Sequence, residues 1–91
     1  MPFTLRYHPD VKTRDLPLID EKLKNRIKTA IEHRLATEPQ RYGEPLRKTL
    51  RGYWKLRVGD YRVVYKIVGK EVLILGIIHR KKVYEAMGKR T

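Results

Sequence analysis

The chain has 91 residues, of which 22 are Lys or Arg and 10 are Asp or Glu, so its formal net charge is +12. This length leaves room for one small domain with one modest core, and we expect residues 1–91 to form a single domain. The charge favours nucleic acid or an acidic protein as the partner.

Composition also argues against several classes of protein. Cysteine is absent, which excludes a disulfide framework and a thiolate metal site. His8, His33 and His79 lack metal-ligand spacing, so we expect neither a metal nor another cofactor. No apolar run approaches the ~20 residues of a membrane span, and residues 1–9 lack the pattern of a secretory signal. The cations do not line one amphipathic face either. We therefore expect a cytoplasmic protein with no membrane partner.

The chain begins with a predicted strand and a short helical turn. Residues 3–7 alternate apolar and polar side chains, and Pro9 ends the strand. Asp10 is placed to cap a helical turn that reaches Leu16, where Pro17 interrupts it.

An amphipathic helix is predicted from about residue 20 to residue 35. Its apolar residues recur at helical spacing: Leu23, Ile27, Ala30, Ile31 and Leu35. Residues 38–45 are rich in Pro and Gly and predict a loop. Residues 46–52 then form a basic connector to the next strand.

Residues 53–68 are typical of a β-hairpin, because two strand patterns flank the turn Gly59-Asp60. The predicted partners are Tyr53 with Lys66, Lys55 with Val64, Arg57 with Arg62, and Val58 with Tyr61. One face would be core, with Trp54, Leu56, Val58, Tyr61, Val63, Tyr65 and Ile67. The other would carry Tyr53, Lys55, Arg57, Arg62, Val64 and Lys66. Like charges facing each other destabilise a sheet, so this face is either an anion-binding surface or simply a solvated basic face.

The last two elements are predicted to be a buried strand and a short helix. Residues 72–78 are apolar on both parities, which indicates a central strand covered on both faces, with Gly76 allowing close approach of a helix. A two-residue turn before this strand would place His79 on the face of Lys55 and Arg62. Residues 81–88 predict a helix with Val83 and Met87 on one side and Tyr84 on another. We expect this terminal helix to be the least anchored element.

These elements predict an α+β domain with a small antiparallel, meander-type sheet and the N-terminal strand at one edge. The N-terminal helices would pack on the apolar face, and a short helix would end the chain. The face with Lys55 and Arg62 would stay free of a covering helix.

Three motifs resemble the RelE/ParE superfamily of bacterial and archaeal toxins, in particular its RelE-like mRNA interferase branch. They are Leu50-Arg51-Gly52, the run Gly-Asp-Tyr-Arg-Val-Val-Tyr at 59–65, and the run Ile-His-Arg-Lys-Lys-Val-Tyr at 78–84. The resemblance implies a RelE-like fold and one of two activities. RelE-like members cleave mRNA in the ribosomal A site, whereas ParE-like members poison DNA gyrase and lack the nuclease residues. Both are neutralised by a small antitoxin.

The resemblance also implies roles for individual residues in metal-free attack of a ribose 2′-OH on the adjacent phosphate. Lys55 would be the base or an electrostatic substitute for it, and crowding by nearby arginines would favour its neutral amine. Arg62 and Arg80 would hold phosphoryl oxygens, and Tyr84 would stack on or position a nucleotide. Nuclease members often carry a second lysine where this chain has Tyr53, which makes His79 a candidate to share the proton transfer.

Further RNA contacts are expected from the surrounding polar residues: Tyr53, Arg57, Lys66, Lys81, Lys82 and Arg51. Structural alternatives remain open at this stage. Arg62 could be an ordinary exposed strand residue, Tyr84 could pack rather than stack, and His79 could be structural.

The expected function is therefore that of a ribosome-dependent mRNA endonuclease, the toxin of a type II toxin–antitoxin system. Gyrase inhibition and non-catalytic RNA binding are the alternatives. The expected partners are the ribosome, mRNA and an acidic RelB-like antitoxin, which would form a hetero-oligomer with this chain.

Overall fold

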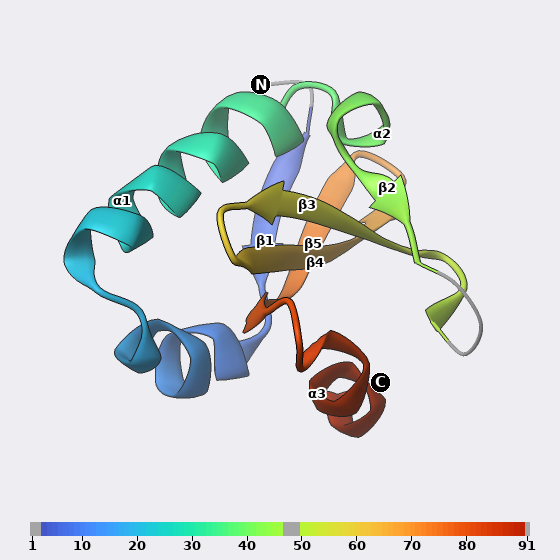
Figure 1. Ribbon diagram of the computed structural model, residues 1–91. Coiled ribbons are helices and arrows are strands. Elements are labelled where there is room, and N and C mark those ends of the chain that lie inside the picture. The colour runs from blue at the N-terminus through green and yellow to red at the C-terminus, as the bar shows by residue number, and fades with distance from the viewer. Residues whose placement is uncertain (1–2, 47–49, 91) are drawn as a thin grey trace.

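The computed structural model describes residues 3–46 and 50–90, which form an α+β fold around a five-stranded sheet of order β1-β5-β4-β3-β2. Figure 1 shows helices α1 and α3 lying apart, on different sides of this sheet. The strands are β1 (Thr4–Tyr7), β2 (Glu44–Pro45), β3 (Tyr53–Val58), β4 (Tyr61–Val68) and β5 (Glu71–His79). The helical segments are η1 (Val11–Asp15), η2 (Leu16–Leu18), α1 (Glu21–Ala30), η3 (Ile31–Leu35), α2 (Pro39–Tyr42) and α3 (Val83–Arg90). The predicted fold class is confirmed.

The β3–β4 hairpin has the predicted register throughout. Tyr53 pairs with Lys66 at its open end, and Val58 pairs with Tyr61 beside the turn. Gly59 has a φ of +59°, the left-handed conformation that a two-residue hairpin turn requires at this position. The hairpin is therefore fixed by its local sequence.

Strand β1 lies at a sheet edge as predicted, but it pairs with β5 in parallel, not antiparallel. The reason is the helical connection between β1 and β3. A helix crossing one face returns the chain to the end of the sheet where it started, so β1 and β3 run in the same direction. Since β5 is also parallel to β3, β1 and β5 become parallel neighbours.

The first core lies between the sheet and the continuous helix formed by α1 and η3. Asp20 caps this helix, because its Oδ1 accepts a hydrogen bond from Leu23 N at 2.8 Å. Ile27, Ile31 and Leu35 recur on one side and are fully buried. They pack in one cluster with sheet residues Leu56, Val58, Val63, Tyr65, Val72, Ile74 and Ile77. The helix predicted to cover the apolar face does so.

The prediction for the first helical turn was partly wrong. The helical backbone continues through η2 to Leu18, because Pro17 stands in the first turn of a helical segment, where the backbone N–H that proline lacks is not needed. The Asp10 side chain forms no cap. Instead, Asp10 N donates to His8 Nδ1 at 3.1 Å.

Residues 38–45 are not the simple loop that their composition predicted. Pro39 begins helix α2, where a proline fits because the first N–H groups of a helix are unpaired, and Glu44–Pro45 forms β2 beside β3. The hydroxyl of Tyr65 donates to the Pro39 carbonyl oxygen and ties α2 to the core. The predicted basic connector extends into residues 47–49, which lie outside the described residues.

Strand β5 lies inside the sheet and is buried on both faces, as predicted. Its second face packs against α3 in a separate cluster that contains Leu46, Leu50, Val64, Leu75, Ile78, Val83 and Met87. A helix therefore does pack on the face that was expected to be free. It covers β5 and Val64 and leaves Lys55 and Arg62 only partly buried.

Helix α3 is firmly anchored, contrary to the sequence-based expectation. Arg90 donates to both carboxylate oxygens of Asp15, at 2.6 Å and 2.8 Å, and to the Leu75 carbonyl at 3.0 Å. The Asp15 Oδ2 atom also accepts from Ile77 N at 2.9 Å. The side chains of Asp15 and Arg90 are only 4% and 9% exposed. This buried pair fastens the end of the chain to η1 and β5.

Candidate functional site

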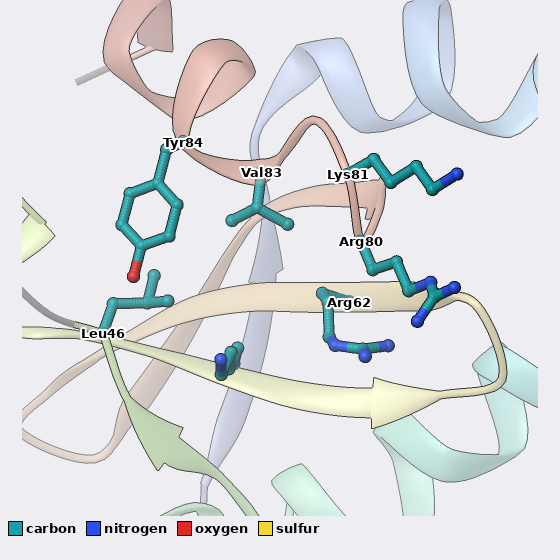
Figure 2. A pocket seen from close by; sticks show the side chains of 7 residues that line it. Leu46, Arg62, Arg80, Lys81, Val83 and Tyr84 are labelled. Carbon is teal, nitrogen blue, oxygen red and sulfur yellow. The ribbon is translucent and has the colours of Figure 1, made fainter.

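Five of the predicted site residues gather around one hollow, which we call the basic pocket. Its volume is about 420 Å³, and it is lined by Leu46, Lys55, Arg62, Arg80, Lys81, Val83 and Tyr84. Figure 2 shows the labelled side chains coming from strand β4, from the turn after β5 and from the start of α3, with Leu46 below Tyr84. The volume is within the ~300–1,000 Å³ range of small-ligand sites.

The hairpin supplies Lys55 and Arg62. Both lie on the sheet face opposite α1, because side chains alternate along a strand and their neighbours Leu56 and Val63 point into the first core. Arg62 Nη1 donates to the carbonyls of Gly59 and Tyr61, at 3.1 Å and 3.0 Å, which holds the guanidinium near the turn. Within the described chain, neither Nε nor Nη2 of Arg62 has a hydrogen-bond partner. Those two donors remain available to an anion.

Arg80 is held beside Arg62 by the backbone. Arg80 N donates to the Asp60 carbonyl at 2.8 Å, which joins the end of β5 to the hairpin turn. The Arg80 side chain also lies 3.8 Å from the Asp60 carboxylate, an exposed pair that is worth little energetically. Together with Lys55 and Lys81, the two arginines place four cations around the pocket. Such a concentration of positive charge favours binding of a phosphate group.

Tyr84 forms one wall of the pocket because its neighbour anchors the helix. Val83 is buried in the second core, so the next residue along α3 projects outward, and Tyr84 is 49% exposed. Figure 2 shows its ring at the pocket, on the same side as Leu46. An exposed ring at the edge of a cationic pocket is suited to stacking on a base.

His79 does not belong to the basic pocket, so the face predicted for it was wrong. The turn between β4 and β5 has two residues as expected, since Val68 pairs with Glu71. A β-bulge at Val64 and Tyr65 shifts the register by one residue, however, and His79 pairs with Tyr61. A one-residue shift moves a side chain to the opposite face.

The remaining predicted residues lie outside the pocket lining. Tyr53 and Lys66 face each other further along the hairpin, with the Lys66 amine 5.5 Å from the ring centre. Arg57 stands opposite Arg62 but lines a different hollow beside α1. Arg51 is exposed before β3, and Lys82 is exposed beyond the pocket.

Sequence reasoning missed one wall of the pocket and two acidic residues near its cations. Leu46 is one of its walls, and Asp60 lies beside Arg80. Glu44 pairs with Lys55 across β2 and β3. Strand β2 was not predicted because Glu44 lies in a segment rich in Pro and Gly. Asp60 was recognised, but only as part of the hairpin turn.

Two further properties bear on the class of site. Among the described residues, no three His, Cys, Asp or Glu side chains lie close enough to hold a metal ion. The helices within residues 3–46 and 50–90 include none that could cross a lipid bilayer.

Comparison with known proteins identifies the class. A family model described as the ParE toxin of the type II toxin–antitoxin system parDE matches residues 5–84. The chain therefore belongs to the RelE/ParE superfamily of type II toxin–antitoxin toxins.

Individual relatives place it within that superfamily. Toxin RelG of Mycobacterium tuberculosis is 38% identical, over 92% of this chain and 98% of its own length. The toxin–antitoxin complex RelBE2 of the same organism contains a chain that is 33% identical, with a TM-score of 0.79 over 88% of this chain and 100% of that chain. A RelB–RelE complex from Methanococcus jannaschii shares the fold at 22% identity, with a TM-score of 0.68 over 89% of this chain and 96% of that one.

Proposed function

We propose that this toxin is a ribosome-dependent mRNA endonuclease and that the basic pocket is its active site. The proposal rests on one observation above all, the presence of Lys55, Arg62, Arg80 and Tyr84 in the lining of a single hollow. A gyrase poison would not need these side chains together.

The reaction would be attack of the ribose 2′-OH on the adjacent phosphate, with departure of the 5′ oxygen. Lys55 would act as the base for the 2′-OH or as an electrostatic substitute that stabilises the developing oxyanion. The free donors of Arg62, with Arg80, would hold the phosphoryl oxygens as negative charge increases. The products would be a 2′,3′-cyclic phosphate and a 5′-hydroxyl, and the departing 5′ oxygen would take its proton from water.

Proton transfer by His79 is not part of this proposal, since that ring faces away from the pocket. Tyr84 would stack on a nucleotide and so fix the scissile phosphate between the cations. Tyr53 stands where nuclease members of the superfamily often carry a second lysine. In this chain, Arg80 and Lys81 would supply positive charge in place of that lysine.

Primer extension on an mRNA in a translating extract tests the proposal. Wild type should produce codon-phased cuts, and Arg62→Ala should reduce the cleavage rate by about 100- to 1,000-fold, the usual cost of losing one oxyanion donor. Lys22→Ala is the matched control, because Lys22 is an exposed cation on α1, on the other side of the sheet. A gyrase supercoiling assay on the same proteins distinguishes the alternatives. Blocked supercoiling would support a gyrase poison, and inactivity in both assays would support simple RNA binding.

We also propose that a short acidic antitoxin, encoded in a neighbouring gene, neutralises this toxin. The +12 charge and the similarity to a chain of the RelBE2 toxin–antitoxin complex support this partner. Charge would accelerate encounter, whereas apolar anchors would set the dissociation rate. Raising the ionic strength should therefore slow association steeply and change dissociation little. Equal salt sensitivity of both rates would mean that charge alone holds the complex.

A further inference from the structure

A second hollow lies on the other side of the turn that carries Arg80 and Lys81, and we call it the distal cleft. Its volume is about 550 Å³, and its lining includes Arg14, Leu18, Tyr61, His79, Lys81 and Lys82. Lys81 lines both the distal cleft and the basic pocket. The two hollows are therefore neighbours that share one cation.

The aromatic part of the cleft is built by the bulge in the sheet. The shifted register places His79 against Tyr61, with ring centres 5.6 Å apart in an edge-to-face arrangement. Lys81 N donates to His79 Nδ1 at 3.3 Å, which fixes the orientation of the imidazole. The side chains of Tyr61 and His79 are partly buried, so they form a rigid surface with accessible atoms.

The rest of the cleft combines apolar surface with positive charge. Leu18 is 81% exposed and adds apolar surface to the lining of the cleft. Arg14, Lys81 and Lys82 supply three cations, of which Arg14 has a loose contact with Asp10 at 3.9 Å. The acid in the lining, Asp15, is already neutralised by Arg90. The cleft therefore carries net positive charge.

We propose that the distal cleft is a second nucleotide subsite, which stacks a base of the same single-stranded RNA that occupies the basic pocket. Aromatic and apolar surface within a cationic groove is the general recipe for binding unpaired nucleotides, since every base can stack and every phosphate is anionic. Lys81 would bind the phosphate between the two nucleotides. This inference rests on the proposed function, because it assigns the flanking nucleotide of the same substrate.

Binding of fully 2′-O-methylated oligoribonucleotides tests the subsite, because the missing 2′-OH prevents cleavage. Fluorescence anisotropy at fixed ionic strength would measure affinity from one to five nucleotides. Wild type should gain affinity when the oligonucleotide becomes long enough to reach the distal cleft. Leu18→Glu should weaken that longer ligand by about tenfold or more and leave the shortest ligand unchanged.

Val68→Glu is the matched control. Val68 is also an exposed apolar residue, at 52%, and it lies at the far end of the hairpin beside the Gly69 turn, so the same charge change is made away from both hollows. Replacing one base of the longer ligand by an abasic unit should reproduce the loss in wild type and add nothing in Leu18→Glu.

The subsite is refuted if affinity does not increase with length in wild type, or if Leu18→Glu and Val68→Glu behave alike. Cleavage in the translating extract is scored separately. Length-dependent binding without cleavage would retain the subsite and reject the nuclease, whereas cleavage without that binding step would do the reverse.

Discussion

The two faces of the sheet are built from the same strands, yet they are closed in different ways. On one face, α1 and η3 cover a mainly apolar cluster that extends across β3, β4 and β5. On the other, α3 covers β5 and Val64, while the neighbouring surface of the hairpin carries Lys55 and Arg62 around an open pocket. Burial of the first face stabilises the fold, whereas the second face is only partly covered and leaves room for a ligand.

The difference shows how a small basic protein combines stability with a charged site. Cations cannot be buried without a counter-ion at acceptable cost. Arg90 follows this rule, because its nearly buried side chain is paired with Asp15. Hydrogen bonds to that carboxylate raise the pKa of Arg90 above its usual value, in opposition to the effect of burial.

The largest effect is expected from breaking this ion pair. Asp15→Asn keeps the shape of the side chain but leaves the nearly buried charge of Arg90 with only the more exposed carboxylate of Asp10 nearby. We expect a loss of about 3–5 kcal/mol in the free energy of unfolding, measured by urea denaturation. Asp10→Asn is the control. Asp10 also contacts Arg90, but at a longer distance of 3.5 Å and with a more exposed side chain, so this substitution should reduce the free energy of unfolding by less. If Asp15→Asn and Asp10→Asn cost the same, the pair does not anchor α3.

The next effect concerns the close approach of α3 to the sheet. A Cβ on Gly76 would lie 2.6 Å from Met87 Cε and 2.8 Å from Arg90 Nη1. Gly76→Ala should therefore displace the ends of the Met87 and Arg90 side chains, disturb the ion pair of Arg90 with Asp15 and cost about 1–3 kcal/mol. Gly88→Ala on the same helix meets nothing within 4 Å and should stabilise slightly. A Gly76→Ala protein as stable as wild type would contradict this packing.

On the fully covered face, Tyr65→Phe removes the hydrogen bond to the buried Pro39 carbonyl. We expect a loss of about 1–3 kcal/mol at pH 8. Burial raises the pKa of Tyr65 well above its usual value of about 10. The folded state therefore keeps the neutral phenol, whereas the unfolded chain ionises it from about pH 10 upward.

Wild type should consequently lose stability above about pH 10 in a way that the phenylalanine variant does not. The difference in unfolding free energy between the two proteins should narrow as the pH rises from 8 to 11. Tyr42→Phe, in which an exposed tyrosine loses the same hydroxyl, provides the control. A difference that stays constant with pH would show that Tyr65 does not titrate differently in the two states.

The smallest effect is expected on the open face, where Arg57 stands opposite Arg62. Arg57→Thr removes one of two like charges and introduces a good β-former, so it should stabilise the fold by about 0.2–1 kcal/mol. Lys70→Thr in an exposed turn removes the same charge away from this pair and serves as the control. The increase in stability should become smaller at high salt, because salt screens the repulsion. A loss of stability would indicate that Arg57 and Arg62 do not destabilise each other.

Local patterns determined much of this protein. The period-two alternation, a turn with glycine first and the helical spacing of Ile27, Ile31 and Leu35 predicted the hairpin, its register and the face that α1 covers. They also placed Lys55 and Arg62 on one surface, because alternation within a hairpin depends only on neighbouring residues.

The tertiary structure decided what lies between distant segments. The bulge that turns His79 toward Tyr61 interrupts the pairing of β4 with β5, which the strand pattern does not indicate, and the direction of β1 depends on where the helical crossover returns. The pairing of Asp15 with Arg90 joins residues 75 positions apart, and no local pattern indicates it. Sequence therefore determined the elements and their faces through short-range periodicity. Burial and charge compensation between segments distant in sequence determined which residues meet at the pocket.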